Sequence, residues 1–103
     1  MNSRPIYKPG DIVYYMYQYS SRFPVFYQVT KVTEKSIYVA PIDKIRYGYT
    51  MGGGSYQAIP DASKPGRVRR LSIRPDGYAY ITYYGHLQRL DAWDGCPVDC
   101  FSD

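Results

Sequence analysis

The sequence predicts a single all-β domain over residues 1–103, and three observations lead to that fold class. Tyrosine occurs fourteen times, and valine and isoleucine supply most of the aliphatic side chains, which fit a pleated sheet better than a helix. Helix-favouring residues are scarce, and Glu34 is the only glutamate. Proline and glycine divide the chain into short extended runs. We therefore expect five to six strands, forming a small SH3-like or OB-like barrel or a strongly curved antiparallel sheet.

The first half of the chain contains the clearest strands. Residues 12–17 are an unbroken run of strand-forming residues, and a break is expected over residues 20–24. The second strand is predicted at residues 25–32 and the third at residues 36–42, joined by a short turn into a hairpin. Neither face of the second strand is cleanly polar, which indicates a strand that is covered on both sides or lies in a curved barrel.

The middle of the chain is less regular. Residues 44–49 have the composition of a further strand, and residues 51–55 and 60–66 are predicted loops. The first loop contains three consecutive glycines, but it lacks the Gly-Lys-Ser/Thr sequence and the helix of a phosphate-binding loop.

The last part of the chain predicts a second hairpin. Residues 67–74 are expected to run extended and to pair with residues 78–84 across a turn at Pro75-Asp76-Gly77, in which the glycine takes a positive φ. Residues 85–90 fit a short strand or a single helical turn. Trp93 is expected to pack back onto the barrel as a lid.

Charge is distributed unevenly along the chain. Residues 1–90 contain all 13 Lys and Arg, whereas residues 91–103 contain four of the nine acids and no base. This pattern predicts a basic body, which suits an anionic partner, followed by an acidic C-terminal tail over residues 91–103. Simple solubility is the alternative explanation of the same charges.

Localisation and redox state follow from what the sequence lacks. No apolar stretch approaches the ~20 residues of a membrane-spanning helix, and the first ten residues have no signal-peptide core, so a cytoplasmic protein is predicted. Cys96 and Cys100 are expected to be reduced thiols. His86 is the only histidine, so the two cysteines lack the second pair of ligands of a structural zinc site. No metal or cofactor is predicted.

The densest functional signal lies in residues 64–74, which contain five basic residues and no acid. If the two aliphatic residues of this strand point inward, alternation exposes Arg70 and Arg74. Arg67 and Arg69 then lie beside the inner row, at the rim of the barrel. The expected hairpin brings tyrosines next to these arginines, a composition typical of single-stranded nucleic-acid surfaces and of protein-interface hot spots. The predicted binding residues are Arg67, Arg69, Arg70, Arg74, Tyr78 and Tyr80. The alternative is structural, with the tyrosines as core and the arginines as soluble surface.

Catalytic patterns are weak throughout the sequence. His86 has no serine or cysteine in a nucleophile context, and Asp91 and Asp94 lack a third ligand that would indicate a metal. A non-enzymatic binding protein is therefore predicted. An acid–base pair formed by His86 and Asp91 is the remaining enzymatic alternative.

The order of four short motifs resembles a family of small proteins that phages and other bacterial mobile elements carry. The motifs are Gly10-Asp11-Ile12-Val13-Tyr14-Tyr15, Phe26-Tyr27-Gln28-Val29-Thr30-Lys31-Val32-Thr33, Lys35-Ser36-Ile37 and Trp93-Asp94-Gly95-Cys96-Pro97. They occur in both halves of the chain, omit residues 43–66, and read as structural motifs.

The resemblance implies a biological setting rather than a set of site residues. Small accessory proteins of mobile elements often block a host defence complex, such as a CRISPR effector, so an anti-CRISPR or other anti-defence inhibitor is one expectation. The partner would be a host protein or ribonucleoprotein in the bacterial cytoplasm. Direct binding of RNA or single-stranded DNA by a small barrel is the alternative.

Overall fold

The computed structural model describes residues 6–18, 21–49 and 55–101, and these ranges form ten β-strands and no helix. The protein is therefore all-β, as the sequence predicts, and its strand pairings are antiparallel. The described ranges thus offer no helix that could cross a membrane. The strands are β1 (Ile12–Gln18), β2 (Arg22–Val32), β3 (Ser36–Pro41), β4 (Asp43–Tyr49), β5 (Ser55–Asp61), β6 (Arg69–Ser72), β7 (Tyr80–Tyr83), β8 (His86–Arg89), β9 (Asp91–Ala92) and β10 (Val98–Phe101).

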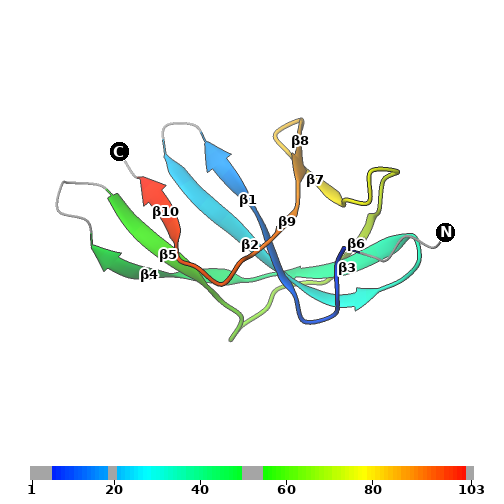
Figure 1. Cartoon of the computed structure of the whole chain (residues 1–103), viewed down its shortest axis with the longest axis horizontal. Helices are drawn as coiled ribbons and strands as arrows, with labels where there is room; N and C mark the ends of the chain where they lie inside the picture. Colours follow the sequence, from blue (N-terminus) through cyan, green and yellow to red (C-terminus); the bar gives the residue numbers. More distant parts are fainter. Residues whose placement is uncertain (1–5, 19–20, 50–54, 102–103) are drawn as a thin grey trace.

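The long strand β2 organises the main sheet (Figure 1). Strands pair in the order β4-β5-β10-β2-β1-β9, and β3 pairs with both β2 and β6. One edge of β2 pairs with β1 from Arg22 to Gln28. The other edge pairs with β3 from Tyr27 to Val32, but with β10 only at Arg22. The sheet is therefore forked, with β3 and β6 in one arm and β10, β5 and β4 in the other, which we call the wing.

Pro24 occupies the fork and explains why neither arm pairs with β2 there. The carbonyl of Phe26 accepts a hydrogen bond of 3.1 Å from the N–H of Ile42, so Phe26 directs its main chain to the forked edge. By alternation, Pro24 faces the same edge, but proline has no N–H to donate. A hollow of about 360 Å³ lies at this point between β2, β4 and the end of β5. Because β2 begins at Arg22 and includes Pro24, the predicted break over residues 20–24 extends too far.

The main cluster of the hydrophobic core lies on one side of the fork. Within the described residues, none of it comes from the wing, whose buried Ala58 and Cys100 lie outside the cluster. In Figure 1, the wing extends to the side opposite β3 and β6. The molecule is elongated as a result, with extents of 49 × 28 × 27 Å. The buried side chains of the cluster are those of Tyr7, Val13, Tyr15, Tyr27, Val29, Ile37, Val39, Leu71, Ala79, Ile81 and Leu90.

The sheet does not close, so of the two predicted architectures the SH3-like or OB-like barrel is wrong and an open antiparallel sheet is found. Ten strands replace the expected five to six. Strand β1 pairs with β9 only at Val13 and Tyr14. Beyond that point, β8 pairs with β7 instead of β1. Tyr84 and Gly85 connect β7 to β8 with φ values of 49° and 79°, and a turn with two positive φ angles suits the twist of a tight hairpin.

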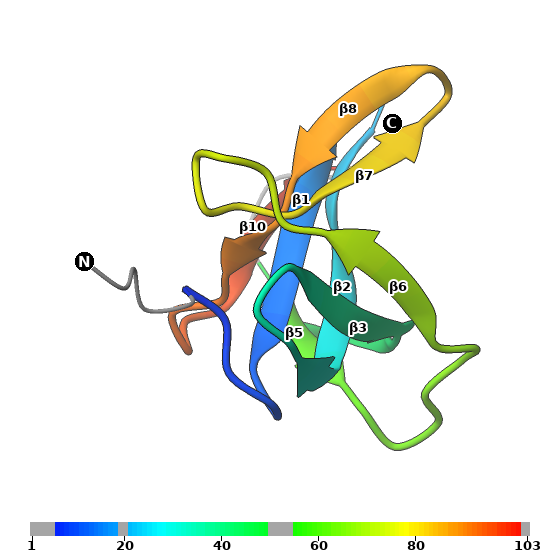
Figure 2. The same cartoon turned by 90° about the vertical axis from the view of Figure 1, so that its right-hand side faces the viewer.

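The arginine-rich strand β6 has a different partner from the one that the sequence predicts. It pairs with β3, where Leu71 stands opposite Ile37, and not with the tyrosine-rich strand β7 (Figure 2). The chain does reverse at the predicted turn, but a single bridge between Ile73 and Ala79 replaces the expected hairpin. Burial of Leu71 against β3 favours the observed pairing because it removes apolar surface from water.

Most of the other predicted strands are confirmed. The observed β1, β3 and β4 agree with the predicted ranges to within a residue, and β2 and β3 form the predicted hairpin. A bulge places Thr30 between the paired residues Val29 and Lys31. The predicted loop over 51–55 lies outside the described residues, except that Ser55 begins β5. Residues 85–90 contain a strand, β8, and no helical turn.

The acidic C-terminal segment is part of the sheet in its described portion. Strand β10 pairs with β5 from Val98 to Phe101, and β9 pairs with β1, so residues 91–101 do not form a free tail. The Trp93 ring packs edge-on against Phe26, with 6.3 Å between ring centroids, and its indole N–H donates to the carbonyl of Cys96.

Candidate functional site

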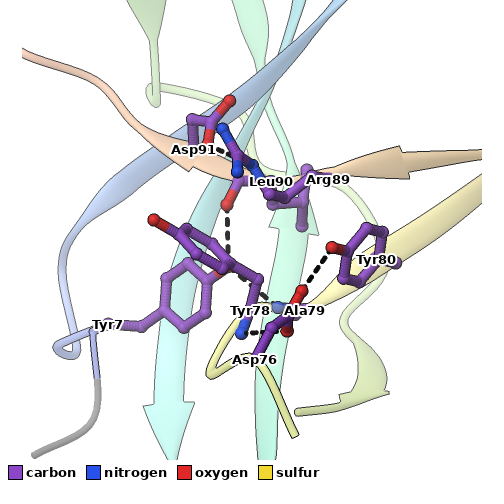
Figure 3. Close-up of polar contacts among 8 residues, drawn as sticks. All are labelled: Tyr7, Asp76, Tyr78, Ala79, Tyr80, Arg89, Leu90 and Asp91. Atoms are coloured by element: carbon purple, nitrogen blue, oxygen red, sulfur yellow. Dashed lines mark hydrogen bonds and ion pairs between the residues drawn. The ribbon is translucent and has the colours of Figure 1, made fainter. Parts of the chain in front are cut away.

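Two arginines and two tyrosines form a cluster at the base of the β7–β8 hairpin, which Figure 3 shows in part. The Arg89 guanidinium carbon lies 4.5 Å from the ring centroid of Tyr78, and that of Arg74 lies 5.0 Å from the ring centroid of Tyr80. Arg89 also stands opposite Tyr80 in the hairpin. We call these four residues the Arg–Tyr cluster. It contains three of the predicted binding residues and adds Arg89.

Two aspartates lie at the Arg–Tyr cluster. Asp91 forms an ion pair with Arg89, at 2.8 Å between Oδ1 and Nε. Asp76 accepts hydrogen bonds from the Tyr80 hydroxyl and from the N–H of Tyr78, and these bonds lower the pKa of the Asp76 carboxyl. Because each guanidinium has a carboxylate nearby, the cluster offers less charge to an anionic partner than the sequence suggests.

A buried tyrosine fixes the position of the β7–β8 hairpin. The Tyr7 hydroxyl donates to the carbonyl of Leu90 at 2.7 Å and accepts from the N–H of Ala79 at 2.9 Å (Figure 3). Leu90 and Ala79 flank the hairpin, and both are fully buried. Burial raises the pKa of Tyr7 to about 12. The N-terminal segment therefore holds both ends of the hairpin through one side chain.

The other three predicted arginines separate into different environments. Arg69 stands opposite Val39, on the core-facing side of β6, and remains exposed at its margin. Arg70 stands opposite Tyr38, on the outer face, as alternation predicts. Arg67 precedes β6 and is exposed in a loop. The six predicted residues therefore do not form one continuous site.

An open cleft runs between β1 and β8. Two adjoining hollows of about 480 and 340 Å³ are lined by β1 from Tyr14 to Gln18, by β8 from His86 to Arg89, and by Tyr83 and Asp91. At one end of the cleft β9 pairs with β1, and at the other end lies the turn between β7 and β8. Ring contacts of 6.0 and 5.6 Å join Tyr83 to Tyr15 and Tyr17, so aromatic side chains form its floor.

Both walls of the cleft are strand edges, and hydrogen bonds fix the direction of their main-chain groups. The N–H of Trp93 donates to the carbonyl of Ile12, so Ile12 and, by alternation, Met16 and Gln18 face away from β2. The N–H of Leu90 donates to the carbonyl of Ala79, so by the same alternation Leu87 faces away from β7. Within the described ranges, no strand pairs with β1 beyond Tyr14 on this side, or with β8 on its outer edge.

Sequence reasoning missed this cleft because it did not predict that β8 leaves β1 to pair with β7. Met16, Gln18 and Leu87 carry no charge or motif that would single them out. The sequence did contain one indication of the cleft, which is the Tyr84-Gly85 pair between two extended runs. A two-residue turn that contains glycine allows β8 to pair with β7, and β8 then does not pair with β1.

The histidine and the aspartate of the enzymatic alternative lie at opposite ends of one extended segment. His86 begins β8 at the hairpin turn and is exposed, whereas Asp91 is paired with Arg89 at the hairpin base. Five residues of extended chain separate them by about 16 Å, too far for one to orient the other. Cys96 and Cys100 are free thiols, the first exposed and the second buried. The described residues contain no group of three or more side chains placed to hold a metal ion.

Comparisons with protein-family models, with curated proteins and with solved structures find no match.

Proposed function

We propose that this chain is a non-enzymatic interaction protein that captures an extended segment of a protein partner by strand addition in the cleft between β1 and β8. The observation that carries the proposal is that the cleft is lined by two strand edges with which no strand of the described residues pairs. An extended peptide adds to such an edge through main-chain hydrogen bonds, and the side-chain pockets beside it supply specificity.

The chemistry of the cleft indicates what kind of segment fits. Its charged lining residues, Arg89 and Asp91, are paired with each other, and the rest of the lining is aromatic, amide, imidazole, Leu and Met. An uncharged extended segment with alternating apolar residues matches these walls better than a charged one. A host protein or the protein component of a ribonucleoprotein in the bacterial cytoplasm, including a defence complex, is the proposed partner.

Substitution Met16→Pro tests strand addition. It removes an N–H that faces the cleft and that no strand of the described protein uses, and proline is tolerated at such edge positions. We expect partner capture from a bacterial lysate to weaken at least tenfold, while the melting temperature changes little. Met16→Leu is the matched control, because it alters the side chain but keeps the N–H, and it should capture the partner as the unmodified chain does.

Amide hydrogen exchange provides a second measurement. In the free protein, we expect Met16, Gln18 and Leu87 to exchange faster than Tyr15 and Tyr17, whose main-chain groups face β2. With the captured partner bound, exchange at the first three should slow. A partner that binds equally well to Met16→Pro, or that protects amides elsewhere but not in the cleft, would contradict the proposal.

A further inference from the structure

A row of two cations and one aromatic ring crosses the outer face of the arm opposite the wing. Lys31 on β2 stands opposite Tyr38 on β3, and Tyr38 stands opposite Arg70 on β6. The neighbours of Tyr38 along β3, Ile37 and Val39, are fully buried, so the row is on the side of the sheet away from the core. Lys31 and Arg70 are exposed. We call Lys31, Tyr38 and Arg70 the cationic row.

A hydrogen bond orients the arginine of the cationic row. The Nε–H of Arg70 donates to the hydroxyl oxygen of Ser36 at 3.1 Å, and Ser36 is buried. This bond uses one of the five N–H donors of the guanidinium and leaves the terminal nitrogens to a ligand. Among the described residues, no carboxylate forms an ion pair with Lys31 or Arg70, whereas Arg89 is paired with Asp91.

The surroundings of the cationic row are also basic. Lys35 lies in the turn between β2 and β3, and Arg67 lies in the loop before β6, both exposed. Glu34 is the acid of that turn. The Arg–Tyr cluster differs in this respect, because Asp91 forms an ion pair with Arg89 and Asp76 interacts electrostatically with both arginines.

We infer that the cationic row binds single-stranded nucleic acid, with phosphates at Lys31 and Arg70 and one base on the Tyr38 ring. Charge complementarity selects a polyanion, and Arg recognises phosphate through paired N–H donors. The aromatic ring between the cations favours a single strand, since an unpaired base can stack on it. In the free protein, Lys31 Nζ lies 5.4 Å from the centroid of the Tyr38 ring. When a base stacks on that ring, the Lys31 ammonium moves off the ring and binds a phosphate. This surface is separate from the cleft, so the inference does not depend on the proposed function.

Fluorescence anisotropy with labelled oligo-dT and oligo-U of about twelve nucleotides tests the inference across a range of salt concentrations. The full chain should bind both oligonucleotides at low salt. The double variant Lys31→Gln/Arg70→Gln should bind at least tenfold more weakly. Its slope of log affinity against log salt should be shallower by about 1.4, because each lost phosphate contact on a single strand contributes about 0.7. Tyr38→Ser should weaken binding, and Tyr38→Phe should retain it.

The matched control is Arg22→Gln/Lys44→Gln, which removes the same charge from β2 and β4 at the wing end of the sheet. It should bind as the unmodified chain does, and so should Met16→Pro. The inference is overturned if no oligonucleotide binds at low salt, or if the control loses as much affinity as the test variant. It is also overturned if a duplex or a poly-glutamate peptide binds the row as tightly as the single strand, since the partner would then be double-stranded DNA or an acidic protein.

Discussion

The substitution Tyr7→Phe is expected to lower the free energy of unfolding by about 3 kcal/mol, although it removes a single oxygen atom. The lost hydroxyl leaves the N–H of Ala79 and the carbonyl of Leu90 without their partner. Both residues are fully buried, so neither group gains water in exchange. An unsatisfied buried polar group costs about 1–3 kcal/mol, and two such groups are created here.

Urea unfolding followed by circular dichroism measures this difference. Tyr84→Phe is the matched control, because its side chain is 79% exposed, and its unfolding midpoint should not change. An unfolding midpoint for Tyr7→Phe equal to that of the unmodified chain would mean that the hydroxyl does not hold the hairpin in solution.

Stability is also expected to fall steeply between pH 10 and pH 12. Burial raises the pKa of Tyr7 from 10.0 to about 12, so the folded state keeps this proton at a pH where the unfolded chain releases it. The stability that the protonated Tyr7 hydroxyl contributes is fully present below pH 10, and it is lost as the pH rises through the pKa of Tyr7 in the folded state. Two pKa units correspond to roughly 2.7 kcal/mol. Burial also raises the pKa of Tyr15, which adds to the loss at higher pH.

Unfolding free energies measured at pH 8, 10, 11 and 12 test this dependence, and Tyr7→Phe identifies its source. The variant lacks the titrating hydroxyl, so its stability should fall by about 2.7 kcal/mol less over the interval. If the unfolding free energies of the two proteins fell in parallel with pH, the loss of stability at alkaline pH would come from other tyrosines.

Local pattern was sufficient to predict the fold class and the first hairpin. Strong runs of β-branched and aromatic residues form β1, β2 and β3. The turn that begins at Thr33 lies between β2 and β3, which form the predicted hairpin. The strands that sequence reasoning missed have weak local signals. Strand β5 contains Pro60, and β10 contains Asp99 and the small Cys100. They are strands because they pair with each other, and because β5 also pairs with β4 and β10 also pairs with β2. These pairings are long-range information.

The candidate site was harder to predict than the fold. Alternation correctly placed Arg70 on the outer face of β6. Because Leu71 is buried, its neighbour Arg70 must point to the opposite side of the strand. It could not show that Arg74 lies in the cluster that also contains Arg89 and Asp76, because that arrangement depends on the pairing of β7 with β8. Tyr38 and Lys31 were overlooked for the same reason, since only the observed pairing of β6 with β3 brings Arg70 beside them.

We expect the two sides of the fork at Pro24 to differ in stability. The wing joins β2 through the pair of Phe101 with Arg22 and through the hydrogen bond from Ile42 to Phe26, and it shares no residue with the main core cluster. A unit with few buried contacts opens at a lower free energy than the whole protein. The wing should therefore unfold locally while β1, β2, β3 and β6 stay intact. A partner that orders the wing would bind more weakly by the free energy of that ordering, whereas the cleft and the cationic row lie in the part of the domain that contains the main core cluster.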